Sequence, residues 1–145
     1  YPWHADDFHR GQGYVREQLS TVQKPALGEY DDTDPAIISQ HLTWSRQANI
    51  NLWVTSWWGE GAREDMTTKD VIMEHPEIGD HKIALFYETN GRIKDGEDHS
   101  MQRVVPDIEY LCQNYFDHPN YFRIDDKPVL FVYLTRKLEF LGTLD

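Results

Sequence analysis

The stretch Ile50–Gly61, INLWVTSWWGEG, is the most informative segment of the sequence. Its first part is a short apolar run with β-branched residues, which predicts a buried strand rather than a helix. The run ends in aromatic, glycine and acidic residues: Trp57, Trp58, Gly59 and Glu60. A hydrophobic strand with such an end typically delivers a binding site at its carboxyl end. Neighbouring strand residues point to opposite faces, so we expect one indole inside the fold and the other against a ligand, rather than both in one core.

The composition limits the classes of partner. The chain has 145 residues, a formal net charge of −11 at pH 7 and 13% aromatic residues, which indicates one domain or part of one. The negative charge argues against nucleic acid and against an anionic membrane surface as partners. Aromatic rings and carboxylates together suit a neutral polar ligand such as a carbohydrate, because rings cover apolar sugar faces and carboxylates accept hydrogen bonds from hydroxyls.

Other features of the chain say little about its location. The single cysteine, Cys112, cannot form an internal disulfide and leaves the redox compartment open. No apolar run reaches membrane-spanning length, and no signal peptide is recognisable. The chain begins at Tyr1 without a methionine, so we expect it to be an excerpt or a processed piece of a longer protein.

Strands and helices alternate along the rest of the chain. We expect a strand end at 1–4, strands at 50–57 and 82–88, and a last strand that begins at Pro128 and ends between Tyr133 and Arg136. We expect helices from Pro35, where Asp34 is the cap, at 69–74, at 104–116 and near Lys137. Long loops are expected at 5–30 and 89–100. This order indicates an α/β fold with a parallel sheet covered by helices. No glycine-rich phosphate loop follows a strand, which disfavours a dinucleotide fold, and we expect no cofactor.

A (β/α) barrel of the TIM type also fits this order, and its chemistry lies where the strands end. The strand ends here carry Trp3 and His4, then Trp57, Trp58 and Glu60, then Tyr87 and Glu88, then Tyr133 and Arg136. Four strands make half of an eight-stranded barrel, and an open half would leave two unpaired edges and an exposed inner face. We therefore expect residues 1–145 to be a partial (β/α)8 barrel that further polypeptide, from the same or another chain, completes.

Several short motifs occur in a recognisable order. They are Tyr1-Pro2-Trp3, Gly28-x-Tyr30, Asp34-Pro35-x-Ile37-Ile38 with His41, Ser56-Trp57-Trp58-Gly59-x-Gly61, Tyr87-Glu88 with Gly91-Arg92, His118-Pro119 with Tyr121-Phe122-Arg123, and PVLFVY at 128–133. In this order they resemble glycoside hydrolase family 99, the endo-α-mannosidase and endo-α-mannanase family, over nearly the whole chain except 5–27. The resemblance implies a (β/α)8 barrel that hydrolyses internal α-mannosidic bonds of a glycan with retention of configuration. It favours the secretory pathway (Golgi), or an extracellular or periplasmic location.

The resemblance also implies catalytic roles. In the family, a glutamate that ends the third strand deprotonates the sugar's own 2-hydroxyl, and Glu88 matches that position. A second glutamate three residues later acts as general acid and base, but Gly91 stands there in this chain. Losing that proton transfer costs typically about 10²–10⁴-fold in rate. The candidates to replace the acid are Asp95, Glu60 and Asp65; alternatively the register around Glu88 differs, or the acid comes from the missing half.

The expected sugar-contacting residues are Trp3, His4, Tyr30, Trp57, Trp58, Tyr87, Arg92 and Tyr133. For Glu88 the alternative is a structural ion pair with Arg92. For His41, on the inward face of its helix, we favour a packing role. The acidic clusters at 31–34 and 95–99 lack the spacing of known metal sites, so we expect solvated loop charge and no metal.

Three functions remain open from the sequence. The first is a glycosidase of the endo-α-mannosidase type with Glu88 as its central residue. The second is a catalytically inactive glycan-binding or structural barrel, which the glycine at position 91 suggests. The third is a glycosyltransferase-like protein of polysaccharide assembly.

Overall fold

A parallel three-stranded sheet lies at the centre of the fold in the computed structural model, which describes residues 26–28, 30–92, 103–133 and 135. Its strands, in the order β1–β2–β5, are β1 Leu52–Trp57, β2 Lys82–Tyr87 and β5 Leu130–Val132. Strand β1 pairs with β2 along its whole length, from Leu52 opposite Lys82 to Trp57 opposite Tyr87. Strand β5 pairs with the other edge of β2. The predicted α/β fold with a parallel sheet is confirmed.

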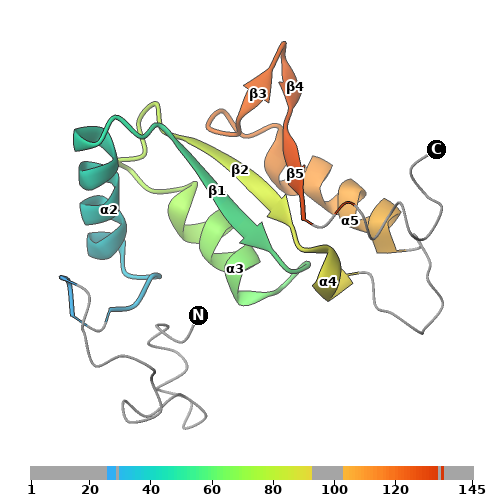
Figure 1. Ribbon diagram of the computed structural model, residues 1–145, viewed down its shortest axis with the longest axis horizontal. Coiled ribbons are helices and arrows are strands. Elements are labelled where there is room, and N and C mark those ends of the chain that lie inside the picture. Colours follow the sequence, from blue (N-terminus) through green and yellow to red (C-terminus); the bar gives the residue numbers. More distant parts are fainter. Residues whose placement is uncertain (1–25, 29, 93–102, 134, 136–145) are drawn as a thin grey trace, which may run out of the picture.

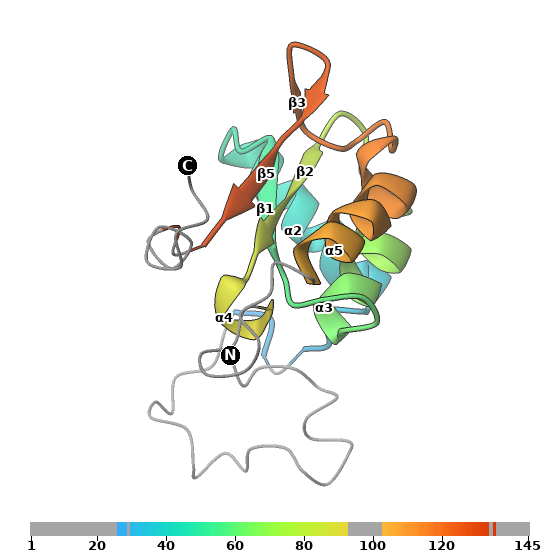
Figure 2. The same cartoon turned by 90° about the vertical axis from the view of Figure 1, so that its right-hand side faces the viewer.

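The helices in the described part of the chain lie on one side of this sheet (Figures 1 and 2). They are α2 Pro35–Gln47, α3 Arg63–Met66 continued by the π-helical η2 Thr67–Ile72, and α5 Val104–Leu111 continued by the π-helical η4 Cys112–Phe116. A short helix, α4 Thr89–Arg92, follows β2 directly. No helix of the described residues is both long enough and apolar enough to span a bilayer.

A two-stranded hairpin precedes β5 and projects beyond the sheet (Figure 1). It pairs β3 Arg123–Ile124 with β4 Lys127–Pro128 in antiparallel fashion, and Asp125 and Asp126 turn the chain with positive φ angles. The hairpin was not predicted from the sequence. Pro128, the expected first residue of the last strand, belongs to this hairpin, so β5 starts only at Leu130.

Helix α2 begins and ends as its sequence predicts. The carboxylate of Asp34 accepts a hydrogen bond from the Ala36 N–H at 2.9 Å, so it satisfies a backbone donor of the first turn. After the helix, Asn49 adopts a left-handed conformation with φ 56°, which asparagine tolerates better than most residues. The predicted Asp34 cap is confirmed, and so is the end at Asn49 that the sequence indicates before the strand at 50–57.

The hydrophobic core fills the space between the sheet and the helices. Its buried members are Ile38, Leu42, Trp57, Ile72, Met73, Ile78, Ile83, Leu85, Tyr87, Leu111, Tyr115 and Tyr121. Within it, the rings of Trp57 and Tyr87 stack with their centroids 5.7 Å apart, from opposite positions on β1 and β2. Alternate residues of the two strands therefore face the helices, as expected for strands with one covered face.

One buried carboxylate, Asp65, connects β1 to the helix layer. It accepts hydrogen bonds from the indole N–H of Trp57 at 2.8 Å, the backbone N–H of Gly61 at 2.9 Å, and the hydroxyls of Tyr110 at 2.7 Å and Tyr115 at 2.5 Å. Burial by itself raises the pKa of Asp65, but the four donors outweigh it and hold the pKa below its ordinary value. Asp65 is therefore an ionised structural group.

Three predicted details are wrong. The helix after β1 begins at Arg63 rather than 69, because Asp65 and its donors draw its first turn onto the core. Residues 89–92, predicted as loop, form α4. Apolar periodicity in the helix at 104–116 predicts Val105 and Cys112 on its inward face, but both are exposed in α5 and η4, whereas Asp107 is buried. Hydrogen bonds from β2 and α4 to Asp107 rotate this helix away from the orientation that apolar periodicity indicates.

Replacing Asp65 by asparagine is expected to lower the free energy of unfolding by about 2 kcal/mol or more. The amide nitrogen of the variant faces donors and leaves buried hydrogen-bonding groups unpaired. Urea titration of the protein measures the change. Asp70→Asn is the matched control, since Asp70 lies on the same helix with an exposed side chain, and its effect should stay within about 0.5 kcal/mol. Equal effects of the two substitutions would contradict the role assigned to Asp65.

Stability is also expected to fall as the pH drops below about 6.5. Burial, with a smaller contribution from the charge of Arg46, lowers the pKa of His81 below its ordinary 6.5. The unfolded state then binds more protons in this range, so the contribution of His81 is complete above pH 6.5 and is lost toward its folded pKa. His81→Phe keeps a ring against Trp53 and removes the titrating group. Urea midpoints measured from about pH 7 to 5 should fall less in this variant than in the wild type, and parallel curves would contradict the account.

Candidate functional site

The carboxyl ends of the three strands lie together at one edge of the sheet. Glu88 follows β2, Trp58 follows β1, and Tyr133 follows β5. The Tyr133 N–H donates to the carbonyl of Tyr87 at 3.0 Å, and the hydroxyl of Thr89 donates to the Tyr133 carbonyl at 2.6 Å. These contacts hold the ends of β2 and β5 beside each other, and the Glu88 N–H, which donates to the carbonyl of Trp57 at 3.1 Å, holds the end of β1 against β2.

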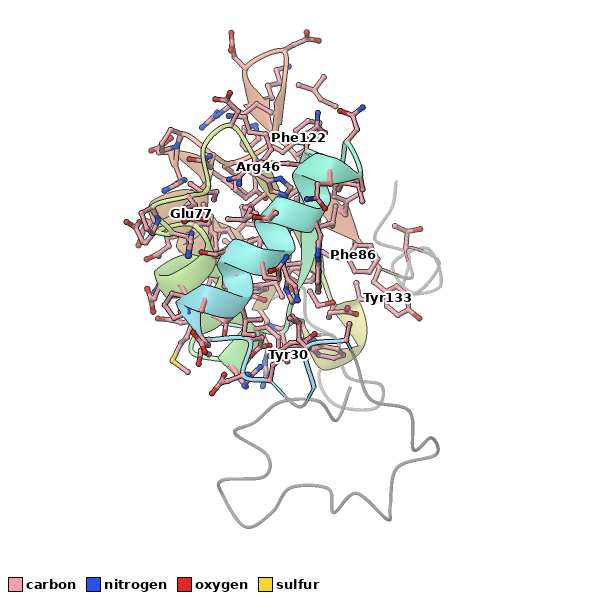
Figure 3. All side chains as sticks on the ribbon, turned by 90° about the vertical axis from the view of Figure 1, so that its left-hand side faces the viewer. Tyr30, Arg46, Glu77, Phe86, Phe122 and Tyr133 are labelled. Atoms are coloured by element: carbon pink, nitrogen blue, oxygen red, sulfur yellow. The ribbon has the colours of Figure 1, made fainter. Side chains whose placement is uncertain are left out.

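One face of the sheet has no helix against it in the described part of the chain (Figure 2). We call it the open face and define it by Val54, Ser56, Phe86, Glu88, Phe131 and Tyr133, which alternate with the helix-facing residues. Figure 3 shows Phe86 and Tyr133 directed away from the helices, and their ring centroids lie 5.6 Å apart. Val54, Phe131 and Tyr133 have exposed side chains. The open face thus combines aromatic rings with a carboxylate.

Glu88 is held on the open face by a hydroxyl group. The Ser56 hydroxyl donates to Glu88 Oε1 at 2.9 Å, and the Glu88 side chain is largely buried, with 8% of the residue exposed. Arg92, which was the alternative partner, forms its ion pair with Asp107 instead, at 2.5 Å. The alternative of a structural Glu88–Arg92 pair is therefore wrong. Within the described residues, Glu88 is in no ion pair.

Trp57 and Tyr87 lie on the helix side of the sheet, away from Glu88. Trp57 is fully buried and donates to Asp65, and the Tyr87 hydroxyl donates to Asp107 at 2.7 Å. Burial and the carboxylate of Asp107 raise the pKa of Tyr87. Both aromatic side chains pack in the core instead of reaching the open face, in contrast to the predicted sugar contacts. Trp58 is 42% exposed, so the two indoles separate as the alternation of β1 predicts.

The predicted substitute acids have different locations. Asp65 is buried on the helix side, and its lowered pKa is the opposite of what a proton donor needs, so its assignment as a substitute acid is wrong. Glu60 is exposed in the loop after Trp58 and stays a prediction. Asp95 lies outside the described residues, as do the predicted sugar contacts Trp3 and His4 and the strand-end residue Arg136.

His41, midway along α2, contacts Tyr30, which precedes the helix. Their ring centroids are 5.4 Å apart in an edge-on arrangement, and His41 also lies 5.9 Å from the ring of Trp44. Burial lowers the pKa of His41, and the nearby charge of Asp32 only partly opposes this. His41 thus packs between aromatic rings, as predicted. Figure 3 shows Tyr30 at the end of the molecule where α4 lies.

Two residues of the site escaped the sequence analysis. Ser56 is the donor to Glu88, and Asp107 is the partner of Arg92 and Tyr87. A signal existed for each of them. Ser56 is a polar residue two positions before Trp58 and therefore on the same side of the strand, and Asp107 is an acid four residues before the buried Leu111 on the inward face of a helix.

The other features of the described structure contribute no residue to the carboxyl edge of the sheet. A pocket of about 350 Å³ lies on the helix side, between α2 and β1, where its lining includes Trp44 and Trp53. Among the described residues, no group of three or more His, Cys, Asp or Glu side chains is placed to hold a metal ion.

Comparisons with known proteins point to one family. The sequence model of glycosyl hydrolase family 99 matches residues 2–140. The glycoprotein endo-alpha-1,2-mannosidase of Mus musculus is 24% identical over 136 residues, which cover 89% of this chain and 29% of that protein. The glycoprotein endo-alpha-1,2-mannosidase-like protein of Homo sapiens is 23% identical over 133 residues, which cover 87% of this chain and 28% of that protein.

Solved structures show the same relation. The GH99 endo-alpha-mannosidase of Bacteroides thetaiotaomicron in complex with bis-tris-propane superposes with a TM-score of 0.71 at 25% identity, over 94% of this chain and 41% of that one. A second structure of the enzyme gives a TM-score of 0.62 at 26% identity, over 85% and 34%. The chain spans less than a third of the length of the curated relatives named above.

Proposed function

Since this chain belongs to glycosyl hydrolase family 99, we propose that it forms part of a glycoside hydrolase that cleaves internal α-mannosidic bonds of a glycan with retention of configuration. Its relatives are named endo-alpha-1,2-mannosidases, and its solved neighbours are named endo-alpha-mannosidases. We also propose that its three parallel strands belong to a (β/α)8 barrel. Within the described residues, one face of the sheet is uncovered and the outer edges of β1 and β5 are unpaired, which supports this, since barrel closure removes both.

The observation that carries the proposal is the joint location of Glu88, Trp58 and Tyr133 at the carboxyl edge of the sheet. Exposed rings at positions 58 and 133 offer apolar surfaces to the C–H faces of a sugar ring. Glu88, between them in the strand order, offers an acceptor for sugar hydroxyls. In barrel enzymes, groups at the carboxyl ends of the strands are the ones that meet substrate.

Of the two carboxylate oxygens of Glu88, Oε2 is the one that we propose meets the substrate. Ser56 donates to Oε1, and no described residue donates a hydrogen bond to Oε2. In the proposed reaction Oε2 takes the proton of the 2-hydroxyl while the 2-oxygen attacks the anomeric carbon. The glycosidic bond breaks in the same displacement, its leaving oxygen takes a proton from a second acid, and water then opens the epoxide-like intermediate at the anomeric carbon, so that the configuration is retained overall.

That second acid is proposed to come from polypeptide outside the described residues, which include no suitable group on the open face. Position 91 is glycine, and Asp65 lies on the helix side, where its carboxylate accepts a hydrogen bond from the indole of Trp57. Paired carboxylates in common glycosidases lie roughly 5–9.5 Å apart across the bond. The candidates for this acid are Asp95, which lies outside the described residues, and a residue from the polypeptide that completes the barrel; Glu60 is solvent-exposed in the loop after Trp58.

Glu88→Gln in the complete protein is expected to lower kcat/KM on an α-mannan oligosaccharide by about 10²–10⁴-fold, because the amide cannot take the proton. The fall should appear in kcat. Release of reducing ends is the measurement. Glu109→Gln, on the exposed side of α5, is the control and should leave both constants unchanged. An effect confined to KM would assign Glu88 to binding alone and contradict its role as a base.

A catalytically inactive glycan-binding protein is the second candidate function. It is favoured by Gly91, which removes the carboxylate that the family resemblance places three residues after Glu88. The two functions are distinguished by measuring hydrolysis and binding on the same oligosaccharide. Binding without release of reducing ends at any enzyme concentration would favour the second function over the first.

Trp58→Ala is expected to weaken oligosaccharide binding roughly tenfold or more, since the exposed indole is proposed to cover a sugar face. Calorimetric titration with an α-mannan oligosaccharide measures the change. Trp44→Ala is a closely matched control, because Trp44 on α2 is 41% exposed against 42% for Trp58. Equal losses in the two variants would mean that Trp58 contributes no specific contact.

A further inference from the structure

Arg92 at the end of α4 connects the two segments that carry the site. Its Nε donates to Asp107 Oδ2 at 2.8 Å and its Nη2 to Asp107 Oδ1 at 2.5 Å. Its Nη1 faces the carbonyl oxygen of Trp58 at 3.5 Å, and its guanidinium lies 5.5 Å from the centre of the Trp57 ring. Arg92 therefore spans from α5 to the loop after β1.

Asp107 anchors this arrangement in the core. Both of its oxygens bind the arginine, which is the two-point geometry that fixes a guanidinium in orientation as well as in distance. Its Oδ2 also accepts the hydroxyl of Tyr87 at 2.7 Å. The side chain of Asp107 is 6% exposed and that of Arg92 is 19% exposed, so water competes little for either partner.

Gly59 is needed for the close approach of Arg92. It has φ 124°, in a region that favours glycine, and a Cβ at this position would lie 2.3 Å from Arg92 Nη1. Any side chain at position 59 would push the guanidinium or the loop away. The loop after β1 thus rests directly on the arginine.

Resting on the function proposed above, we propose that the Arg92–Asp107 pair is a positioning device that holds Trp58 and Glu88 in fixed relation to each other. Trp58 immediately precedes Gly59, and the carbonyl of Glu88 accepts the backbone N–H of Arg92 at 3.2 Å. One ion pair therefore controls the loop behind the exposed indole and the turn behind the carboxylate. Arg92 acts through these two residues, in contrast to the direct sugar contact predicted from the sequence, because its donors are directed at Asp107 and at the Trp58 carbonyl.

The first test needs no sugar and uses the complete protein. Arg92→Lys keeps the positive charge but loses the two-point fork, and it should change the acrylamide quenching of Trp58 emission in the folded protein. The Trp58 signal is obtained by subtracting the emission of Trp58→Phe variants. Arg123→Lys, in the exposed hairpin, is the control and should leave the quenching unchanged. Unchanged quenching in Arg92→Lys would overturn the proposal whether or not the protein hydrolyses mannan.

The second test separates positioning from sugar contact. In a hydrolysing protein, Arg92→Lys should lower kcat by about 10–100-fold with little change in KM, since a small displacement of a catalytic group has an effect of this size. A rise in KM with unchanged kcat would assign Arg92 to the sugar and overturn the proposal, and so would unchanged kcat with only a lowered melting temperature. Gly59→Ala keeps both charges and should reproduce the effects on quenching and kcat, and it is the deciding variant where Arg92→Lys does not fold.

Discussion

The alternation of side chains along β1 and β2 is the constraint on which the rest of the structure depends. It directs Trp57 and Tyr87 into the helix layer and leaves Ser56 and Glu88 on the opposite face. A shift of register by one residue would exchange these two sets and bury the carboxylate among apolar groups. The six consecutive residue pairs between β1 and β2 fix that register. The site therefore follows from strand geometry before any loop is considered.

Three acidic side chains at this end of the molecule have different environments and hence different roles. Asp65 accepts hydrogen bonds from four donors, and Asp107 accepts them from an arginine and a tyrosine. Both carboxylates therefore have structural roles. Glu88 receives one hydroxyl from a described residue. The chemistry of a carboxylate depends on what its oxygens already bind, which is why we propose Glu88, to whose Oε2 no described residue donates a hydrogen bond, for the sugar-handling role.

Much of this arrangement could be predicted from the sequence, and the limits have physical causes. The apolar strands, the Asp34 cap and the separation of Trp57 from Trp58 follow from local patterns of period two and 3.6. The partners of Arg92 and Asp65 could not be predicted, because they are contacts between residues far apart in sequence. The same holds for the buried Asp107, where a tertiary ion pair overrides the apolar stripe that periodicity favours.

We propose that the edge formed by Glu88, Trp58 and Tyr133 contacts a mannose-containing glycan. A crystal structure of the complete protein with a bound α-mannan oligosaccharide tests it most directly. The account predicts a sugar hydroxyl within about 2.6–3.2 Å of Glu88 Oε2 and the indole of Trp58 against a sugar face. An oligosaccharide bound on the helix side of the sheet, or one that contacts neither residue, would contradict it.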